Sequence, residues 1–193
     1  AMYRAVTLYG LRHGAVQDGD VNEALLIAML PEIEITFAFN SERGASDIFL
    51  NGENVEKRIR SIEVSDLVSK VSGIAAVREQ LVRQQQQLGR QKGIVMDGRD
   101  IGTTVFPNAE LKIFVTATPE IRARRRYDEL KAKGQEASFD EILENVKQRD
   151  YIDQHRDVSP LRKADDALLL DNTDLTIAQQ KEWLFDQFNK VTN

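Results

Sequence analysis

Three short apolar runs, each followed by turn residues and a helical pattern, limit what this chain can fold into. They occupy residues 94–96, 111–115 and 167–170. Apolar runs of this length are typical of strands that are covered on both faces, as in a parallel sheet. Parallel strands need long crossover connections, and helices usually provide them. The alternation therefore predicts an α/β fold in which helices flank a parallel sheet.

Capping residues mark the predicted starts of three helices. A Ser or Thr hydroxyl before proline, or one followed three residues later by Glu or Gln, can satisfy backbone N–H groups of the first helical turn. These pairs are Thr118 with Pro119, Ser138 with Glu141, and Thr176 with Gln179. Helices are also predicted within residues 2–30, with a turn at 14–19, and within residues 65–91.

A small antiparallel sheet is predicted within residues 32–57. Apolar and polar side chains alternate along residues 33–39, which is typical of a half-buried strand. A second short strand at 47–50 leads into Asn51 and Gly52, two residues that tolerate a positive φ and favour a hairpin turn. We therefore expect a hairpin insert between helices.

The composition excludes several classes of site. The sequence has no Cys and only two His, so it cannot form disulfides, a thiolate metal site or a His-rich one. No run approaches the roughly 20 apolar residues of a membrane span. We therefore expect a cytoplasmic protein, monomeric, without a membrane or nucleic-acid partner. A net charge of −5 also argues against general affinity for nucleic acids.

Basic residues nevertheless concentrate in one segment of twelve residues. They are Arg122, Arg124, Arg125, Arg126, Lys131 and Lys133. Two interpretations stay open at this point. The segment is either a solvated helix face or a local site for an anion, of which phosphate fits arginine best.

A helical stripe that begins apolar ends in three charges. The apolar residues Phe139, Ile142 and Val146 are followed at the same helical spacing by Arg149, Asp153 and Arg156. Burying charges is costly unless partners are supplied. Either the helix leaves the core here and the charges are solvated, or the charges line a polar pocket.

Three charged residues follow directly after the first apolar run: Asp97, Arg99 and Asp100. Ligands of open α/β sheets bind beyond the carboxyl ends of the strands. An Asp at such an end can hold a phosphate-bound Mg²⁺, an Arg can bind a phosphate, and a second Asp can accept from an amino group or hydroxyl. A surface turn with local ion pairs is the alternative interpretation.

These segments together resemble the bacterial cytidylate kinases. The motifs that carry the resemblance are AMYRAVTLY, LNGENVEKRIRS, VSKVSGIAAVREQL, DGRDIGTTVFPNAELKIFVTA, QRDYIDQHR, SPL and ADDALLLDNT. They follow one another in the family's order and extend from residue 1 to about residue 180. Such a series is far more specific than any single motif.

The resemblance implies a nucleoside-monophosphate-kinase version of the P-loop fold. It implies transfer of the γ-phosphoryl group of ATP to CMP or dCMP, with Mg²⁺. Residues 1–193 would form a single domain, in which 32–57 is the monophosphate-binding insert and 119–160 a mobile lid.

The resemblance also implies roles for particular residues. Those for the acceptor nucleotide are Arg4 at the CMP phosphate, Ser69, Arg78 and Asp100 at the cytosine edge, Arg149 and Asp153 at the ribose, and Arg99 and Arg156 at phosphates. Those for the donor and for transfer are Arg122, Arg124 and Arg126 at ATP, Asp97 at Mg²⁺, and Arg99, Arg126 and Arg156 in neutralising charge.

Two of the base-reading residues set a geometric requirement. Ser69 and Arg78 are nine positions apart, so one continuous helix would point them to opposite sides. If both contact the base, a break or turn must lie between them.

One expected motif is absent from the sequence. It contains no GxxxxGK[ST] phosphate loop, and none of its glycines precedes a lysine. In the family this loop lies on the first strand, before the segment that resembles AMYRAVTLY. We therefore expect an N-terminally incomplete chain that lacks its first core strands and is nearly inactive. The competing hypotheses are a non-catalytic CMP-binding or regulatory fragment and a nucleic-acid-binding module.

Overall fold

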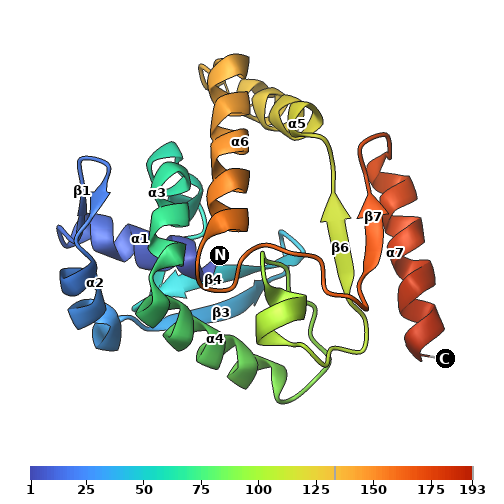
Figure 1. Cartoon of the computed structure of the whole chain (residues 1–193), viewed down its shortest axis with the longest axis horizontal. Coiled ribbons are helices and arrows are strands. Elements are labelled where there is room, and N and C mark those ends of the chain that lie inside the picture. Colours follow the sequence, from blue (N-terminus) through green and yellow to red (C-terminus); the bar gives the residue numbers. More distant parts are fainter. Residues whose placement is uncertain (133, 193) are drawn as a thin grey trace. The chain divides into compact units, whose positions relative to one another are not determined.

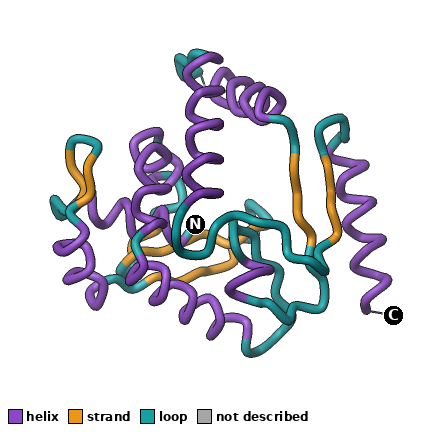
Figure 2. Tube along the Cα trace, viewed as in Figure 1, coloured by secondary structure: helices purple, strands orange, loops and turns teal. Residues whose placement is uncertain are grey.

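Helices and three small sheets alternate along the chain (Figures 1 and 2). The computed structural model describes residues 1–132 and 134–192. The chain divides into two units, Ala1–Gln91 and Lys92–Asn193. The elements bear out a mixed α/β class, whereas the assignment of one domain with an insert and a lid stays a prediction.

The first unit contains most of the helices and the larger sheet. Its elements are α1 (Met2–Arg12), β1 (Val16–Gln17), β2 (Asp20–Val21), α2 (Glu23–Met29), a 3₁₀ turn (Leu30–Glu32), β3 (Ile35–Asn40), β4 (Ala45–Leu50), β5 (Glu53–Asn54), a second 3₁₀ turn (Arg58–Arg60), α3 (Ile62–Gly73) and α4 (Ala75–Gly89). The turn expected at residues 14–19 is a short two-stranded ribbon, β1 with β2.

The predicted hairpin insert is present as an antiparallel sheet in the order β3-β4-β5. In the register of β3 with β4, Ile35 lies opposite Leu50 and Asn40 opposite Ala45. Asn51 and Gly52 have φ values of 48° and 81°, the left-handed conformation that a tight hairpin turn needs. The sequence prediction of this turn is confirmed.

The hydrophobic core of the first unit surrounds α1. This helix buries Met2 and every residue from Ala5 to Gly10, and it packs against α3, α4 and β4. A helix that is apolar on nearly all sides is expected to be central rather than half-exposed. The other core side chains come mainly from α2, β4, α3 and α4 and include Leu26, Ile48, Val64, Val71, Val77 and Leu81.

The predicted break between Ser69 and Arg78 is confirmed. α3 ends at Gly73, and α4 begins at Ala75. Ile74 between them has an extended backbone, with φ −70° and ψ 120°. The two helices therefore change direction at one residue.

In its described residues, the second unit contains one parallel strand pair and three long helices. Its elements are a π-helical turn (Ile101–Val105), β6 (Ile113–Thr116), α5 (Pro119–Ala132), α6 (Phe139–His155), β7 (Leu168–Asp171) and α7 (Ile177–Thr192). β6 pairs with β7 in parallel, from Ile113 opposite Leu168 to Thr116 opposite Asp171.

The predicted caps begin the three helices of this unit. The hydroxyl of Thr118 accepts from the N–H of Ile121 at 3.4 Å, and that of Ser138 accepts from Glu141 at 3.4 Å. At α7 the cap is reciprocal. The N–H of Gln179 donates to Thr176 Oγ1 at 3.2 Å, and the N–H of Thr176 donates to Gln179 Oε1 at 2.9 Å.

The expectation of three fully covered parallel strands is wrong. Residues 94–96 are a loop, and Val95 is 98% exposed. In the described part of the chain no strand pairs with this segment, so its backbone has no ladder to join. The two strands that do pair keep exposed apolar side chains, such as Val115 at 51% and Leu169 at 56%. An apolar run thus marks a segment suited to a strand, but pairing needs a neighbour.

A buried carboxylate joins the strands of the first unit. Asp47 is 6% exposed and accepts from the side-chain amides of Asn40 at 2.9 Å and Asn54 at 3.0 Å. The guanidinium of Arg43 also contacts it. These amide hydrogen bonds, followed by the charge of Arg43, lower the pKa of Asp47. A lowered pKa stabilises the fold above the carboxyl's unfolded value of about 3.9, and this contribution is lost as the pH falls.

We expect Asp47→Asn to make stability less sensitive to acid. The melting temperature of the native protein should fall more between pH 6 and pH 3 than that of the variant, because the variant has no carboxylate to protonate. Thermal unfolding followed by circular dichroism at both pH values measures this difference. Glu42→Gln, at an exposed position in the turn between β3 and β4, is the control and should follow the native protein. Equal losses in native protein and Asp47→Asn would contradict the prediction.

Candidate functional site

The break at Ile74 directs a buried arginine back to the end of α3. Arg78 on α4 is 2% exposed, and its Nη1 donates to the backbone carbonyl of Ser72 at 3.0 Å. The hydroxyl of Ser72 donates to the carbonyl of Ser69 at 3.0 Å. Ser69 is itself 3% exposed. The structure therefore links the predicted base-reading residues of this unit through one intervening serine.

Residues of α1 extend this group. The guanidinium carbon of Arg78 lies 5.2 Å from the ring centroid of Tyr3, a cation–π contact. The neighbouring Arg4 donates from Nη1 to the carbonyl of Ile59 at 3.0 Å and to Ser65 Oγ at 2.8 Å. Ser65 lies one turn before Ser69 on α3. Arg4, Ser69 and Arg78 thus belong to one neighbourhood of α1, α3 and α4.

In the second unit, one buried carboxylate lies between two arginines. Asp153 is 2% exposed, and its Oδ2 accepts from Arg99 Nε at 3.0 Å. Its Oδ1 lies 3.6 Å from Arg156 Nη1. The side chain of Arg156 is 5% exposed, whereas that of Arg99 is 47% exposed. Asp153 and Arg156 are therefore buried and paired, which contradicts the solvated interpretation of this helix face, and the polar pocket stays a prediction.

The charge of this triad suits an anion. One carboxylate faces two guanidinium groups, so the three side chains of Arg99, Asp153 and Arg156 carry a net charge of +1. Arg99 also keeps about half its surface open to solvent. Arg149, one turn before Asp153 on α6, is half-buried.

Asp97 and Asp100 differ in their surroundings. Asp100 is 4% exposed and precedes the π-helical turn, where its carbonyl accepts from the N–H of Thr104 at 2.9 Å. π-helical turns are rare and frequent at functional sites. Asp97 is exposed. Within residues 1–132 and 134–192, no three His, Asp or Glu side chains gather as a metal site.

A single exposed carboxylate such as Asp97 is still compatible with Mg²⁺ bound to a nucleotide. Mg²⁺ in nucleotide sites keeps several waters and takes one or two carboxylates together with phosphate oxygens. The residues present therefore fit a metal that arrives with its nucleotide rather than one held by the protein alone.

The arginines of α5 have four different sets of contacts. Arg122 binds Asp150 of α6 through two hydrogen bonds of 2.9 and 2.5 Å. Arg124 lies over the ring of Phe139 at 4.4 Å. Arg125 donates to Asn172 in the loop after β7, at 2.6 Å to its carbonyl, and Arg126 pairs with Glu129 at 2.9 Å. Lys133 lies outside the described residues.

Two of these contacts, those of Arg122 with Asp150 and of Arg124 with Phe139, connect α5 to α6 within the predicted lid. Tyr127 and Phe139 pack edge to face at 6.3 Å, and the guanidinium of Arg124 also lies 5.5 Å from the Tyr127 ring. Arg122 and Arg124, two of the three arginines expected at ATP, therefore also stabilise the helix pair.

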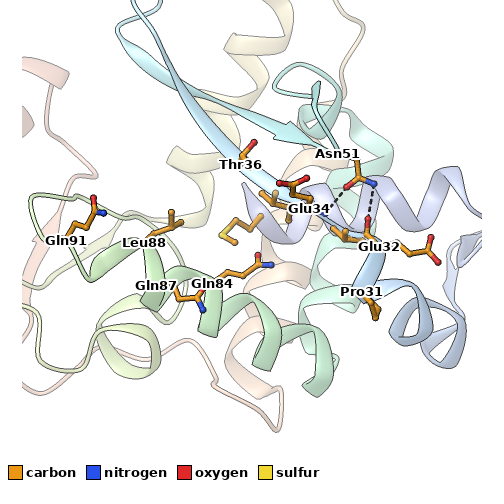
Figure 3. A pocket seen from close by; sticks show the side chains of 12 residues that line it. Pro31, Glu32, Glu34, Thr36, Asn51, Gln84, Gln87, Leu88 and Gln91 are labelled. Atoms are coloured by element: carbon orange, nitrogen blue, oxygen red, sulfur yellow. Dashed lines mark hydrogen bonds between the residues drawn. The ribbon is translucent and has the colours of Figure 1, made fainter.

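A surface pocket of about 700 Å³ lies elsewhere in the first unit (Figure 3). It is lined by the start of β3 and the end of α4, with Glu32, Asn51, Gln84 and Gln87 among its polar residues. Asn51 closes one side by donating to the carbonyl of Glu32 at 2.9 Å. All predicted site residues are described, and none of them lines this pocket. The candidate site is therefore the charged groups and not the pocket.

Comparison with known proteins decides the family. A family model described as cytidylate kinase matches residues 1–190. The chain belongs to the cytidylate kinase family. Three relatives, each named cytidylate kinase, come from Bacteroides thetaiotaomicron, Parabacteroides distasonis and Porphyromonas gingivalis. They are 66%, 58% and 56% identical to it, over 99%, 99% and 100% of this chain and 83%, 83% and 84% of their own.

Membership of the cytidylate kinase family confirms a nucleotide-binding kinase and implies a nucleoside monophosphate kinase fold of mixed α/β class. The comparisons do not support the expected inactivity. The matches cover 83–84% of the relatives' own lengths, so the expectation of an incomplete N-terminus stays a prediction. They also do not support a non-catalytic fragment. No helix in the described part of the chain has the length and apolar character of a membrane span.

The sequence did not identify several residues that hold the predicted site in place. They are Tyr3 beside Arg78, Ser72 between Ser69 and Arg78, Asp150 opposite Arg122, and Ser159 beside Arg156. Asp150 carried a weak signal, since it lies three residues before Asp153 in the same charged helix end. The others act through a ring face or a backbone carbonyl, which sequence patterns do not show.

We expect Arg122 and Asp150 to stabilise the packing of α5 on α6 jointly. Each single change to Ala should lower the melting temperature by about 2–4 °C, equivalent to roughly 1 kcal/mol, because a partly buried charge loses its partner. The double variant should lose clearly less than the sum of the two. Thermal unfolding of all four proteins measures this coupling.

The pair of Arg83 with Glu79 is the matched control. Both of its side chains are about two-thirds exposed, at 65% and 69%. Its coupling should be near zero because water screens exposed charges. Strict additivity for Arg122 and Asp150 would show that their contact contributes nothing.

Proposed function

We propose that this protein transfers the γ-phosphoryl group of ATP to CMP or dCMP, with Mg²⁺, and releases ADP with CDP or dCDP. The triad of Arg99, Asp153 and Arg156, in which Asp153 and Arg156 are buried, is the observation that carries this proposal. It combines a net positive charge with restricted side-chain positions, and it occurs in a chain of the cytidylate kinase family.

Phosphoryl transfer needs alignment and positive charge more than covalent help from the protein. Arg99 and Arg156 bind phosphate oxygens and neutralise the charge that develops on the transferred group. Asp153 restricts the approach of both guanidinium groups and accepts from a ribose hydroxyl. Arg149, one turn earlier on α6, contributes to the ribose contact.

The cytosine edge is read by Ser69, Arg78 and Asp100. Each is buried, at 3%, 2% and 4% exposure, so a base that leaves these groups without hydrogen bonds is rejected. The carbonyl of Ser72 holds Arg78 in place without neutralising its charge. Arg4, anchored to α3 through Ser65, binds the CMP phosphate.

Arg122, Arg124 and Arg126 provide the proposed contacts to ATP. Each has a partner within the second unit, so binding ATP exchanges or shares these contacts. Asp97 would hold a Mg²⁺ that arrives with the nucleotide, and the metal would supply positive charge to the phosphates during transfer.

Two measurements separate the parts of this proposal. Calorimetry with CMP alone tests the acceptor site, and a coupled assay of ADP formation with CMP and Mg·ATP tests transfer. Turnover that requires both CMP and Mg²⁺ is the expected result. Binding of CMP without turnover would reject the transfer reaction, and the absence of CMP binding would reject the acceptor site.

Arg99→Ala should reduce kcat/KM for CMP by about 10²–10³-fold, as expected when a group that stabilises transition-state charge is removed. The coupled assay measures this change, and Arg83→Ala, at an exposed surface pair of α4, should leave activity within about 2-fold of native. An Arg99→Ala protein with native kcat/KM would remove Arg99 from the reaction.

A further inference from the structure

The loop that follows α6 returns to contact two residues of the proposed site. The carbonyl of Ser159 accepts from Arg156 Nε at 2.8 Å. The N–H of Leu161 donates to the carbonyl of Asp153 at 2.7 Å. The last carbonyls of a helix lack partners within the helix, so this second contact caps α6. Residues 157–161 are thus attached at both Arg156 and Asp153.

Ser159 has an unfavourable backbone for its position. Its φ is +50°, a left-handed conformation that few residues other than glycine adopt. It also precedes Pro160, and residues before proline favour extended conformations. Strained backbone persists only where its surroundings enforce it, and it concentrates at functional sites.

This conformation has a specific consequence for Arg156. The guanidinium is nearly buried, with its side chain 5% exposed, and its Nε donates to the carbonyl that the left-handed residue presents. Asp153 Oδ1 lies 3.6 Å from Nη1 on another edge of the same group. A planar guanidinium that is held along two edges cannot rotate freely. A backbone carbonyl fixes its orientation while leaving its positive charge intact.

We propose that Ser159 is a positioning residue for phosphoryl transfer: its left-handed backbone aims a carbonyl at Arg156 and thereby orients the guanidinium toward phosphate. This inference rests on the proposed role of Arg156 and adds the loop of residues 157–161 to the site. The contribution comes from the backbone conformation and not from the hydroxyl.

Three substitutions of Ser159 separate conformation from chemistry. Ser159→Gly permits the positive φ, and Ser159→Ala removes only the hydroxyl, so both should keep kcat/KM for CMP within about 3-fold of native. Ser159→Val opposes the positive φ, because a branched β-carbon is a genuine outlier there, and should lower kcat/KM by about 10- to 100-fold. Native activity in Ser159→Val would overturn the proposal, as would an equal loss in all three variants.

A double-mutant cycle distinguishes positioning from general damage. In an Arg156→Ala background Ser159→Val should cost no further activity, since the side chain it orients is gone. If Ser159→Val lowers kcat/KM by the same factor in both backgrounds, the proposal is overturned, whatever the melting temperatures are. If Arg156→Ala itself keeps native activity, the proposed role of Arg156 is wrong, and this inference about catalysis is wrong with it.

The hydrogen bond itself can be observed without any assay of catalysis. The Nε–H resonance of Arg156, identified by its loss in Arg156→Lys, should exchange with water at least about 10-fold more slowly than that of the exposed Arg83. Ser159→Gly should keep this protection. Exchange as fast as that of Arg83 in the native protein would overturn the positioning role even if Ser159→Val fails to fold. If the Nε–H of Arg156 is protected but the protein does not phosphorylate CMP, the proposed function is rejected and the hydrogen bond to Ser159 is confirmed.

Discussion

The buried carboxylate of Asp153 is the constraint on which the second unit depends. A carboxylate at 2% exposure requires cationic or hydrogen-bonding partners, because leaving it without them would cost several kcal/mol. Arg99 supplies one partner from a loop 54 positions earlier, and Arg156 supplies another from the end of the same helix. The end of α6 and the loop containing Arg99 are therefore fixed relative to each other by charge, in a unit whose strands keep much apolar surface exposed.

The guanidinium groups of Arg78 and Arg156 are held in a similar way. Each is almost fully buried, and each donates to a backbone carbonyl, that of Ser72 for Arg78 and that of Ser159 for Arg156. A carbonyl satisfies a donor and sets its direction but does not cancel its charge. Where a carboxylate is also present, as Asp153 is, two cations share it. Both contacts satisfy a donor of a buried guanidinium and set its direction.

The sequence predicted those features that depend on local chemistry. Caps at Thr118, Ser138 and Thr176 and the turn at Asn51 follow from hydroxyl and amide chemistry over a few residues. The break before Arg78 follows from helical geometry together with the roles that the family resemblance implies for Ser69 and Arg78. It failed at residues 94–96, because a strand needs a partner that no local pattern supplies. The helical stripe placed Asp153 and Arg156 on one face. The partner Arg99 and the carbonyl of Ser159 became visible only in three dimensions.

The arginine-rich segment shows why charge density alone is a weak guide to a site. Arg122, Arg124, Arg125 and Arg126 are nearly consecutive, yet they contact a carboxylate, an aromatic ring, a loop carbonyl and a helix neighbour in turn. Successive helical positions point about 100° apart, so adjacent arginines must meet different surroundings. An anion that binds here competes with contacts of unequal strength. The contact of Arg126 with Glu129, whose carboxylate is 45% exposed, is the easiest to exchange. The two-bond contact of Arg122 with Asp150, whose carboxylate is 22% exposed, is the hardest. Any response of the two helices to a nucleotide should therefore begin at Arg126 and leave the pairing of α5 with α6 intact.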